Sequence, residues 1–77
     1  MDAGTGQVRG SIVEKLSPRQ REIMEMVAKG LTERQIAREL GIAARTVKYH
    51  KATARSRTGC QSSVELAVKF VLEVRGL

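Results

Sequence analysis

The sequence predicts an all-α fold, in which a compact domain of four helices carries a helix-turn-helix at its centre. Apolar residues recur at intervals of three and four along residues 18–75, which is the spacing of helices with one buried face. Helix-start and helix-stop residues divide this stretch into four segments, and a glycine follows each segment. Nowhere does the sequence alternate apolar and polar residues in the manner of a strand.

The N-terminal segment shows neither the pattern of a fold nor that of a targeting signal. Residues 1–13 are rich in glycine and aperiodic, so we expect a flexible tail or linker ahead of a folded domain at residues 14–77. The segment lacks the basic-then-apolar layout of a secretory signal, and the chain has no run of about 18 apolar residues. We therefore expect a cytoplasmic protein that does not bind a membrane.

The first two helices each open on a capping box. In this arrangement a Ser or Thr side chain and a Gln side chain three residues later bond each other's backbone amides. The two pairs are Ser17 with Gln20 and Thr32 with Gln35. Pro18 suits the first position of the first helix, and a glycine ends each helix, at Gly30 and at Gly41. The second helix is therefore short, at roughly eight residues.

The third helix is expected over about residues 44–58, where Gly59 ends it. Between the second and third helices lies the stretch ELGIAART, in which a glycine and an apolar residue separate two helical segments. A short turn of this kind is typical of a helix-turn-helix, here spanning about residues 32–51. A fourth helix opens at Ser62, with Glu65 completing a third capping box.

The net charge of +6 is concentrated in residues 42–61. That segment holds five Lys or Arg and no Asp or Glu, whereas acidic and basic side chains nearly balance in the rest of the chain. A surface that serves only solubility usually mixes both signs. A segment of one sign is typical of a domain that binds a polyanion, although ordinary solubilising residues remain an alternative on charge alone.

On a helical wheel the third helix separates into two faces. Its outward face carries cations, one phenol and small residues: Arg45, Lys48, Tyr49 and Ala52, extended by Arg55 and Ser56. Its core face is expected to be Val47, Ala54 and Thr58, with His50 and Lys51 on the borders. A DNA major groove about 12 Å wide admits one helix, and the outward face lacks the bulky apolar residues that insert into lipid. We therefore favour DNA as the partner.

The sequence offers no arrangement for catalysis, a cofactor or a metal. The single histidine, His50, has no Ser, Cys or Asp spaced to work with it, and one His with one Cys cannot form a structural zinc site. The single cysteine, Cys60, excludes an internal disulfide and is expected to be a small apolar residue under a turn. We therefore expect a non-enzymatic protein without cofactors.

Residues 16–71 contain three stretches in a fixed order: LSPRQREIMEMVAKGLTERQIARELGI, RTVKYH and VELAV, with a glycine between the last two. Their combination resembles the LuxR/GerE-type helix-turn-helix domains of bacterial transcription regulators, which also form the output domains of NarL/FixJ-type response regulators. The resemblance implies a four-helix fold with the third helix in the major groove of DNA. It also implies dimerisation through the last helix.

The resemblance further implies roles for individual residues. The base-facing positions are Lys48, Tyr49 and Ala52. Thr32, Thr46 and His50 are expected near phosphates. The charge of the third helix, apart from the resemblance, adds three cations to the phosphate-facing set: Arg45, Lys51 and Arg55. The chain departs from the family at Ala43, where a Ser or Thr usually caps the third helix. The missing cap costs about 1 kcal/mol of helix stability.

The last helix is apolar on two sides. One stripe is expected to face the core of the domain: Val64, Ala67, Val68, Val71 and Val74. A second stripe needs another surface to cover it, so we expect it to form the dimer interface: Leu66, Phe70 and Leu77. The alternative is that this second stripe packs under the first helix or the N-terminal segment.

The sequence therefore predicts sequence-specific binding of double-stranded DNA by a bacterial transcription regulator that acts as a homodimer. Two alternatives remain, a sigma-factor region-4-like domain and a protein-interaction module that uses its last helix. Contact with RNA polymerase is left open. The chain is expected to be either a complete small regulator or the output domain of a longer protein with an N-terminal sensor or receiver domain.

Overall fold

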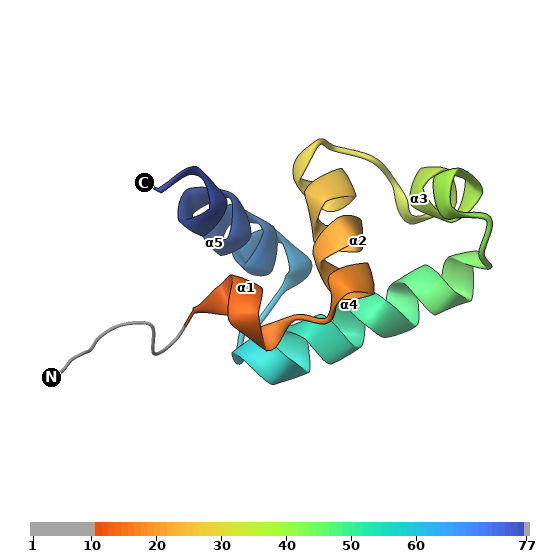
Figure 1. Cartoon of the computed structure of the whole chain (residues 1–77). Helices are drawn as coiled ribbons and strands as arrows, with labels where there is room; N and C mark the ends of the chain where they lie inside the picture. Colours follow the sequence, from red (N-terminus) through yellow and green to blue (C-terminus); the bar gives the residue numbers. More distant parts are fainter. Residues whose placement is uncertain (1–10, 77) are drawn as a thin grey trace, which may run out of the picture.

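The computed structural model describes residues 11–76 and confirms the all-α prediction (Figure 1). Within these residues the chain forms five helices and no strand: α1 (Ile12–Lys15), α2 (Pro18–Ala28), α3 (Glu33–Leu40), α4 (Ala44–Thr58) and α5 (Ser63–Arg75). The four predicted helices are present as α2 to α5. The single turn α1 was not predicted as a helix of its own.

The folded domain begins earlier than expected. Ser11 caps α1, and the side chain of Ile12 is buried. The carboxylate of Glu73, on α5, accepts hydrogen bonds from the Ser11 hydroxyl and from the Ile12 amide, the latter at 2.6 Å. The assignment of residues 11–13 to a flexible tail is therefore wrong, since α5 holds them in place. The remainder of that predicted tail, residues 1–10, lies outside the described residues.

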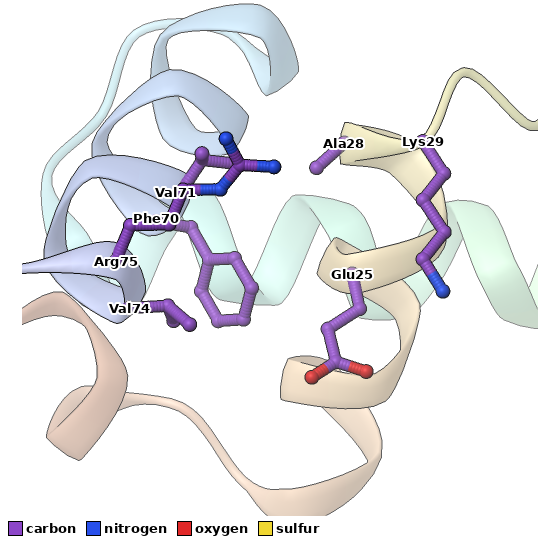
Figure 2. Close-up of a pocket in the computed structure, with 7 residues that line it drawn as sticks. All are labelled: Glu25, Ala28, Lys29, Phe70, Val71, Val74 and Arg75. Carbon is purple, nitrogen blue, oxygen red and sulfur yellow. The ribbon is translucent and has the colours of Figure 1, made fainter.

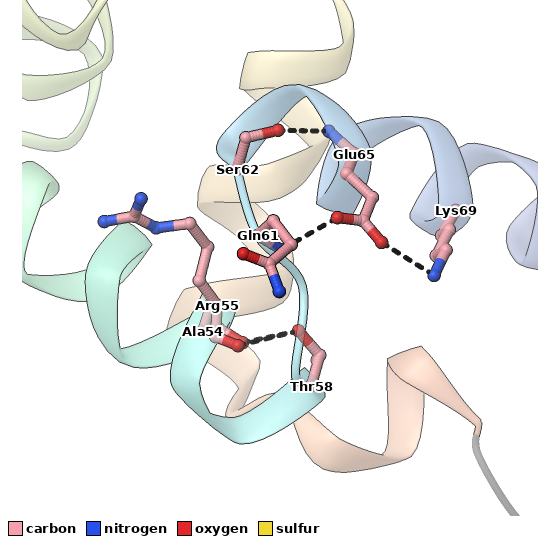
Figure 3. A network of polar contacts seen from close by, with 7 residues as sticks. All are labelled: Ala54, Arg55, Thr58, Gln61, Ser62, Glu65 and Lys69. Atoms are coloured by element: carbon pink, nitrogen blue, oxygen red, sulfur yellow. Dashed lines mark hydrogen bonds and ion pairs between the residues drawn. The ribbon is translucent and has the colours of Figure 1, made fainter.

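The capping boxes at Ser17 and Thr32 are formed as predicted. The third one is only half formed (Figure 3). The Ser62 hydroxyl oxygen accepts the Glu65 amide at 3.1 Å, but the Glu65 carboxylate bonds the Gln61 amide at 2.7 Å and the Lys69 ammonium at 2.9 Å. The start of α5 is thus fixed by a carboxylate that reaches one residue further back than in the predicted motif.

Two apolar clusters hold the helices together. The larger one lies between α1, α2, α4 and α5 and contains Ile12, Leu16, Met24, Ala54, Cys60, Leu66, Ala67 and Phe70. The smaller one lies between α2, α3 and α4 and contains Ile23, Ile36, Ala37 and Val47. Val27, on α2, packs against both clusters, so α2 links the two halves of the domain. Cys60 is buried in the larger cluster, as predicted for a small apolar residue.

The longest helix, α4, spans the domain, with α3 near its first residues, α5 near its last and α2 between them (Figure 1). The turn between α3 and α4 depends on Gly41, whose φ of 69° lies in the left-handed region that favours glycine. The Ile42 amide then bonds the Ala37 carbonyl at 3.0 Å, which closes the end of α3. This compact turn makes α3 and α4 a helix-turn-helix. No helix within the described residues has both the length and the apolar character needed to cross a bilayer.

Candidate nucleic-acid interface

The outward face of α4 has the composition expected from the helical wheel. Its exposed side chains are Arg45, Lys48, Tyr49, Ala52 and Ser56, and the Tyr49 side chain is among the most exposed apolar groups of the domain, at 65%. Val47 and Ala54, on the opposite face, are fully buried against α2 and its neighbours. The three predicted base-facing residues therefore lie together on one accessible surface.

The third predicted core residue, Thr58, is half-buried at the end of α4. Its hydroxyl donates to the carbonyl oxygen of Ala54 at 2.8 Å (Figure 3). This bond within the helix satisfies the hydroxyl, so Thr58 can lie at the edge of the core without an unpaired polar group.

The first turn of α4 has no side-chain cap. Ala43 occupies the cap position with an extended backbone, at φ −74° and ψ 147°, and contributes only its carbonyl, which accepts from the Thr46 and Val47 amides. The departure from the family at Ala43 is thus present in the structure. The amides of the first turn point out of the helix end, where the helix dipole favours an anion.

The predicted phosphate-facing residues differ in how exposed they are and in whether their polar atoms already have hydrogen-bond partners. The Thr32 side-chain oxygen accepts the Gln35 amide at 3.1 Å, which leaves its hydroxyl proton available as a donor. His50 is half-buried, its ring lies edge-on to that of Tyr49, and its Nδ1 has no hydrogen-bond partner within residues 11–76. Thr46 is half-buried beside it on the same flank of α4. Arg55 is half-buried too, and its Nε lacks a partner within the described part of the chain.

Lys51 forms an ion pair that the sequence did not predict. Its ammonium lies 3.1 Å from a carboxylate oxygen of Glu33, the first residue of α3, and only 18% of the Lys51 side chain is exposed. Its charge is thus paired with that of Glu33 across the helix-turn-helix, which reduces the free charge that Lys51 offers to a phosphate. The distribution of charge along the sequence did not predict this contact, because Glu33 lies 18 residues before Lys51.

On α5 the two apolar stripes are largely exchanged relative to the prediction. Of the stripe expected to face the core, Ala67 is buried as predicted, whereas Val64, Val68 and Val74 are exposed. Leu66 and Phe70 are buried, with 0% and 3% exposure, in the larger cluster, so their assignment to a dimer interface is wrong. The third predicted interface residue, Leu77, lies outside the described residues. The exposed stripe consists instead of Val64, Val68 and Leu72, with exposures of 72%, 52% and 43%. The bulkier stripe is buried because α1, α2 and α4 converge on that side of α5.

The exposed stripe of α5 borders a groove shared with α2. The groove has a volume of about 360 Å³ and is lined almost entirely by apolar side chains: Val27, Ala28, Val64, Ala67, Val68, Val71 and Leu72. A neighbouring cavity of about 320 Å³ shares Ala28 and Val71 with it, and Figure 2 shows the charged side chains of Glu25, Lys29 and Arg75 around its mouth. No residue of α4 lines either cavity.

A short glycine turn between α3 and α4, together with a cationic outward face on α4, defines a helix-turn-helix domain of the DNA-binding class. Comparison with known proteins specifies the class further. The family described as bacterial regulatory proteins, luxR family, matches residues 14–70, and the chain belongs to this family. It is a DNA-binding transcription-regulator domain, and the sigma-factor alternative is set aside. The family is one of regulators and not of enzymes.

Similar proteins include several response regulators. The tetrathionate response regulatory protein TtrR of Salmonella typhimurium is 39% identical over 57 residues, which cover 74% of this chain and 28% of the relative. The nitrate/nitrite response regulator protein NarL of Escherichia coli is 41% identical over 56 residues, 73% of this chain and 26% of the relative. The two-component response regulator PprB of Pseudomonas aeruginosa is 58% identical over 36 residues, 47% of this chain and 13% of the relative. The chain thus spans about a quarter of the length of TtrR and NarL, and no solved structure matches it significantly.

Proposed function

We propose that the domain binds double-stranded DNA in a sequence-specific manner, with α4 in the major groove. The observation that carries this proposal is the division of α4 into a fully buried face and an exposed face that bears Arg45, Lys48 and Tyr49 without an acidic side chain. Because Ala52 and Ser56 are small, the helix axis can approach the base edges closely.

The proposed base contacts follow from the chemistry of the groove. The Lys48 ammonium suits the two acceptors of guanine, and the methyl group of Ala52 suits the methyl group of thymine. The Tyr49 side chain offers both a ring face and a hydroxyl one position further along the same surface. Few side chains therefore read the sequence, and contacts to the sugar-phosphate backbone fix their register.

The phosphate contacts are proposed to come from both sides of the turn. Arg45 and Arg55 supply charge along α4, and Thr46 and His50 supply donors on its flank. The hydroxyl of Thr32, at the start of α3, adds a contact from the supporting helix. A helix start with free amides and a positive dipole end favours a phosphate at this position.

We infer that two copies associate through α5. The exposed stripe of Val64, Val68 and Leu72, with the adjacent apolar groove, is continuous apolar surface that a second copy would cover. A two-fold dimer of this kind places two α4 helices on one side of the DNA, about one helical turn apart. The operator would then be an inverted repeat.

The printed descriptions of TtrR, NarL and PprB as response regulators suggest the wider context. We propose that the domain is the DNA-binding output of a bacterial regulator of that kind, which acts in the cytoplasm where the DNA is. In this role a sensor or receiver domain would supply the signal, and contact with RNA polymerase would be a further step towards transcription.

Selection of bound duplexes from a random DNA pool tests the DNA-binding proposal. We expect enrichment of one inverted motif whose half-sites lie about 10 base pairs apart, centre to centre. A pool that stays random after repeated rounds, while the protein remains folded and binds DNA, would reduce the function to non-specific binding.

Sedimentation of the Val68→Glu variant tests the dimer. A carboxylate on the exposed stripe is expected to lower the dimer fraction, because it would be desolvated at the interface. Lys15→Glu places a carboxylate at an exposed position of α1, outside the stripe, and serves as the control. If both variants sediment like the unmodified protein, the stripe is not the interface.

A further inference from the structure

Glu33 and Lys51 form an ion pair between α3 and α4, away from the turn that joins them. The turn at residues 41–43 joins the last residue of α3 to the first of α4, so the direct covalent connection holds the two helices together only at that end. Glu33 is the first residue of α3, at the end remote from the turn, and its carboxylate meets the Lys51 ammonium at 3.1 Å. The ion pair therefore bridges the two helices well away from their covalent connection.

The ion pair lies in a partly shielded position. The side chains of Lys51 and Glu33 are 18% and 32% exposed, which is less than in the other described pairs within single helices, such as Arg19 with Glu22 at 42% and 48%. Shielding from water strengthens the attraction, and the cost of desolvating each charge makes an unpaired partner unfavourable. A break in the pair is thus costlier here than at an ordinary surface site.

The fully buried apolar contact between α3 and α4 is confined to one place. It consists of Ile36, Ala37 and Val47, with Ile23 from α2 beneath them, and the partly buried side chains of Leu31, Leu40 and Ile42 pack against it. Ala37 and Val47 have short side chains, so this contact fixes the place where the helices meet more firmly than the angle at which they cross. A bond made far from the meeting point opposes a change of that angle more effectively than one made close to it.

We propose that Glu33 is a positioning residue for DNA recognition, which acts through Lys51 to set the angle between α3 and α4. This inference rests on the proposed function. The angle determines the distance between the start of α3, where Thr32 would bond a phosphate, and the base-facing residues of α4. With the pair intact, phosphate contacts and base contacts can form in the same register.

If Glu33 acted on DNA binding only through its charge, its removal would strengthen binding. The carboxylate lies on the side of the domain that would face DNA, so its loss would strengthen binding to every duplex by reducing repulsion. A positioning role instead predicts that selectivity falls, because the two sets of contacts no longer match one register. The ratio of affinities for a selected duplex and a scrambled duplex separates these effects, since it cancels the general change in charge.

The test compares Glu33→Ala, Lys51→Ala and the double variant by titration with both duplexes. Glu39→Ala is the matched control, because it removes an exposed carboxylate from the same helix without touching Lys51. We expect each single variant to lower the affinity ratio by about five-fold, the lower range of what a lost base contact costs. The double variant should lower the ratio no further, whereas Glu39→Ala should leave it unchanged.

Circular dichroism and the thermal midpoint of each variant show whether the domain stays folded. An unchanged ratio in Glu33→Ala, or losses that add in the double variant, would overturn the positioning role while leaving the proposed function intact. An unmodified protein that does not distinguish the two duplexes would instead contradict the proposed function itself. A fall in the ratio equal to that of Glu39→Ala would reduce Glu33 to a general charge effect.

Discussion

Lys48 and Tyr49 illustrate, at the scale of single residues, how α4 divides its side chains between folding and binding. Both side chains are exposed, and the core beneath them is made by Val47 and Ala54. The sequence was sufficient to place these four residues, because the helical period fixes which ones share a face. It was not sufficient for Lys51, since a count of charges along the chain does not show that Glu33 folds back against it.

Substituting Lys48 or Tyr49 by alanine is expected to change binding but not stability. Exposed side chains outside special contacts contribute within about 0.5 kcal/mol to the free energy of unfolding, whereas a lost base contact costs about 1–3 kcal/mol of specific binding. Titrations with selected and scrambled duplexes, alongside urea unfolding, measure both quantities. Lys15→Ala, at an exposed lysine on α1, is the control. Equal losses on both duplexes would assign Lys48 and Tyr49 to the phosphate backbone.

Ala43→Ser should stabilise the domain. The residue already has the extended backbone of a helix cap, so a hydroxyl there can accept an amide of the first turn, from Arg45 or Thr46. We expect the free energy of unfolding to rise by about 0.5–1 kcal/mol. Ala44→Ser, one residue inside the helix, lacks this geometry and should give no gain in the same thermal or urea experiment. Equal midpoints for both variants would show that the first turn of α4 is satisfied in another way.

At the scale of helices, α5 shows the limit of the sequence prediction. Both of its apolar stripes have helical spacing, so the period alone cannot decide which one is buried. The decision depends on the directions from which α1, α2 and α4 approach, and this is a property of the tertiary fold. For the same reason the sequence did not predict α1, a single turn that is held in place by a carboxylate about 60 residues away in the sequence.

The corrected orientation of α5 predicts different costs for its two stripes. Phe70→Ala should lower the free energy of unfolding by about 3–5 kcal/mol, because it opens a cavity in the larger cluster. Val68→Ala, at protein concentrations where the monomer dominates, should cost about 0.5 kcal/mol or less. Urea unfolding followed by circular dichroism compares the two variants. Similar costs for both would contradict the assignment of the stripes.

Glu73 makes the contact between α1 and α5 dependent on pH. Burial tends to raise the pKa of this carboxyl, but hydrogen bonds from the Ser11 hydroxyl and the Ile12 and Val13 amides outweigh it and lower the pKa. A carboxyl with a lowered pKa in the folded state stabilises that state fully above its ordinary pKa of about 4.3. The contribution is then lost as the pH falls through the lower, folded-state value.

Glu73→Gln should therefore weaken the dependence of unfolding on acid pH. Thermal midpoints measured between about pH 6 and pH 3 should fall less steeply for this variant than for the unmodified protein. Glu14→Gln, an exposed residue of α1 itself, is the control and should follow the unmodified protein. Parallel curves for Glu73→Gln and the unmodified protein would show that other carboxyl groups cause the acid sensitivity.

At the scale of the whole molecule, the domain keeps its two proposed surfaces apart. The cationic face belongs to α4, and the exposed apolar stripe belongs to α5, which lies near the other end of that helix (Figure 1). DNA and a second copy could therefore bind at the same time. Local signals in the sequence were enough to predict the helices and the helix-turn-helix, because caps and glycine stops act within a few residues. Contacts between helices, such as those of Glu33 and Glu73, required the structure.

The central claim is that the outward face of α4 reads DNA. Amide chemical shifts of the 15N-labelled domain, followed during titration with the selected duplex, test it most directly. The account predicts that the largest changes fall on residues 45–52 and at the start of α3, with smaller ones on the outer stripe of α5. Changes centred on α5, with residues 45–52 unaffected, would contradict it and would favour a protein-interaction surface on the last helix.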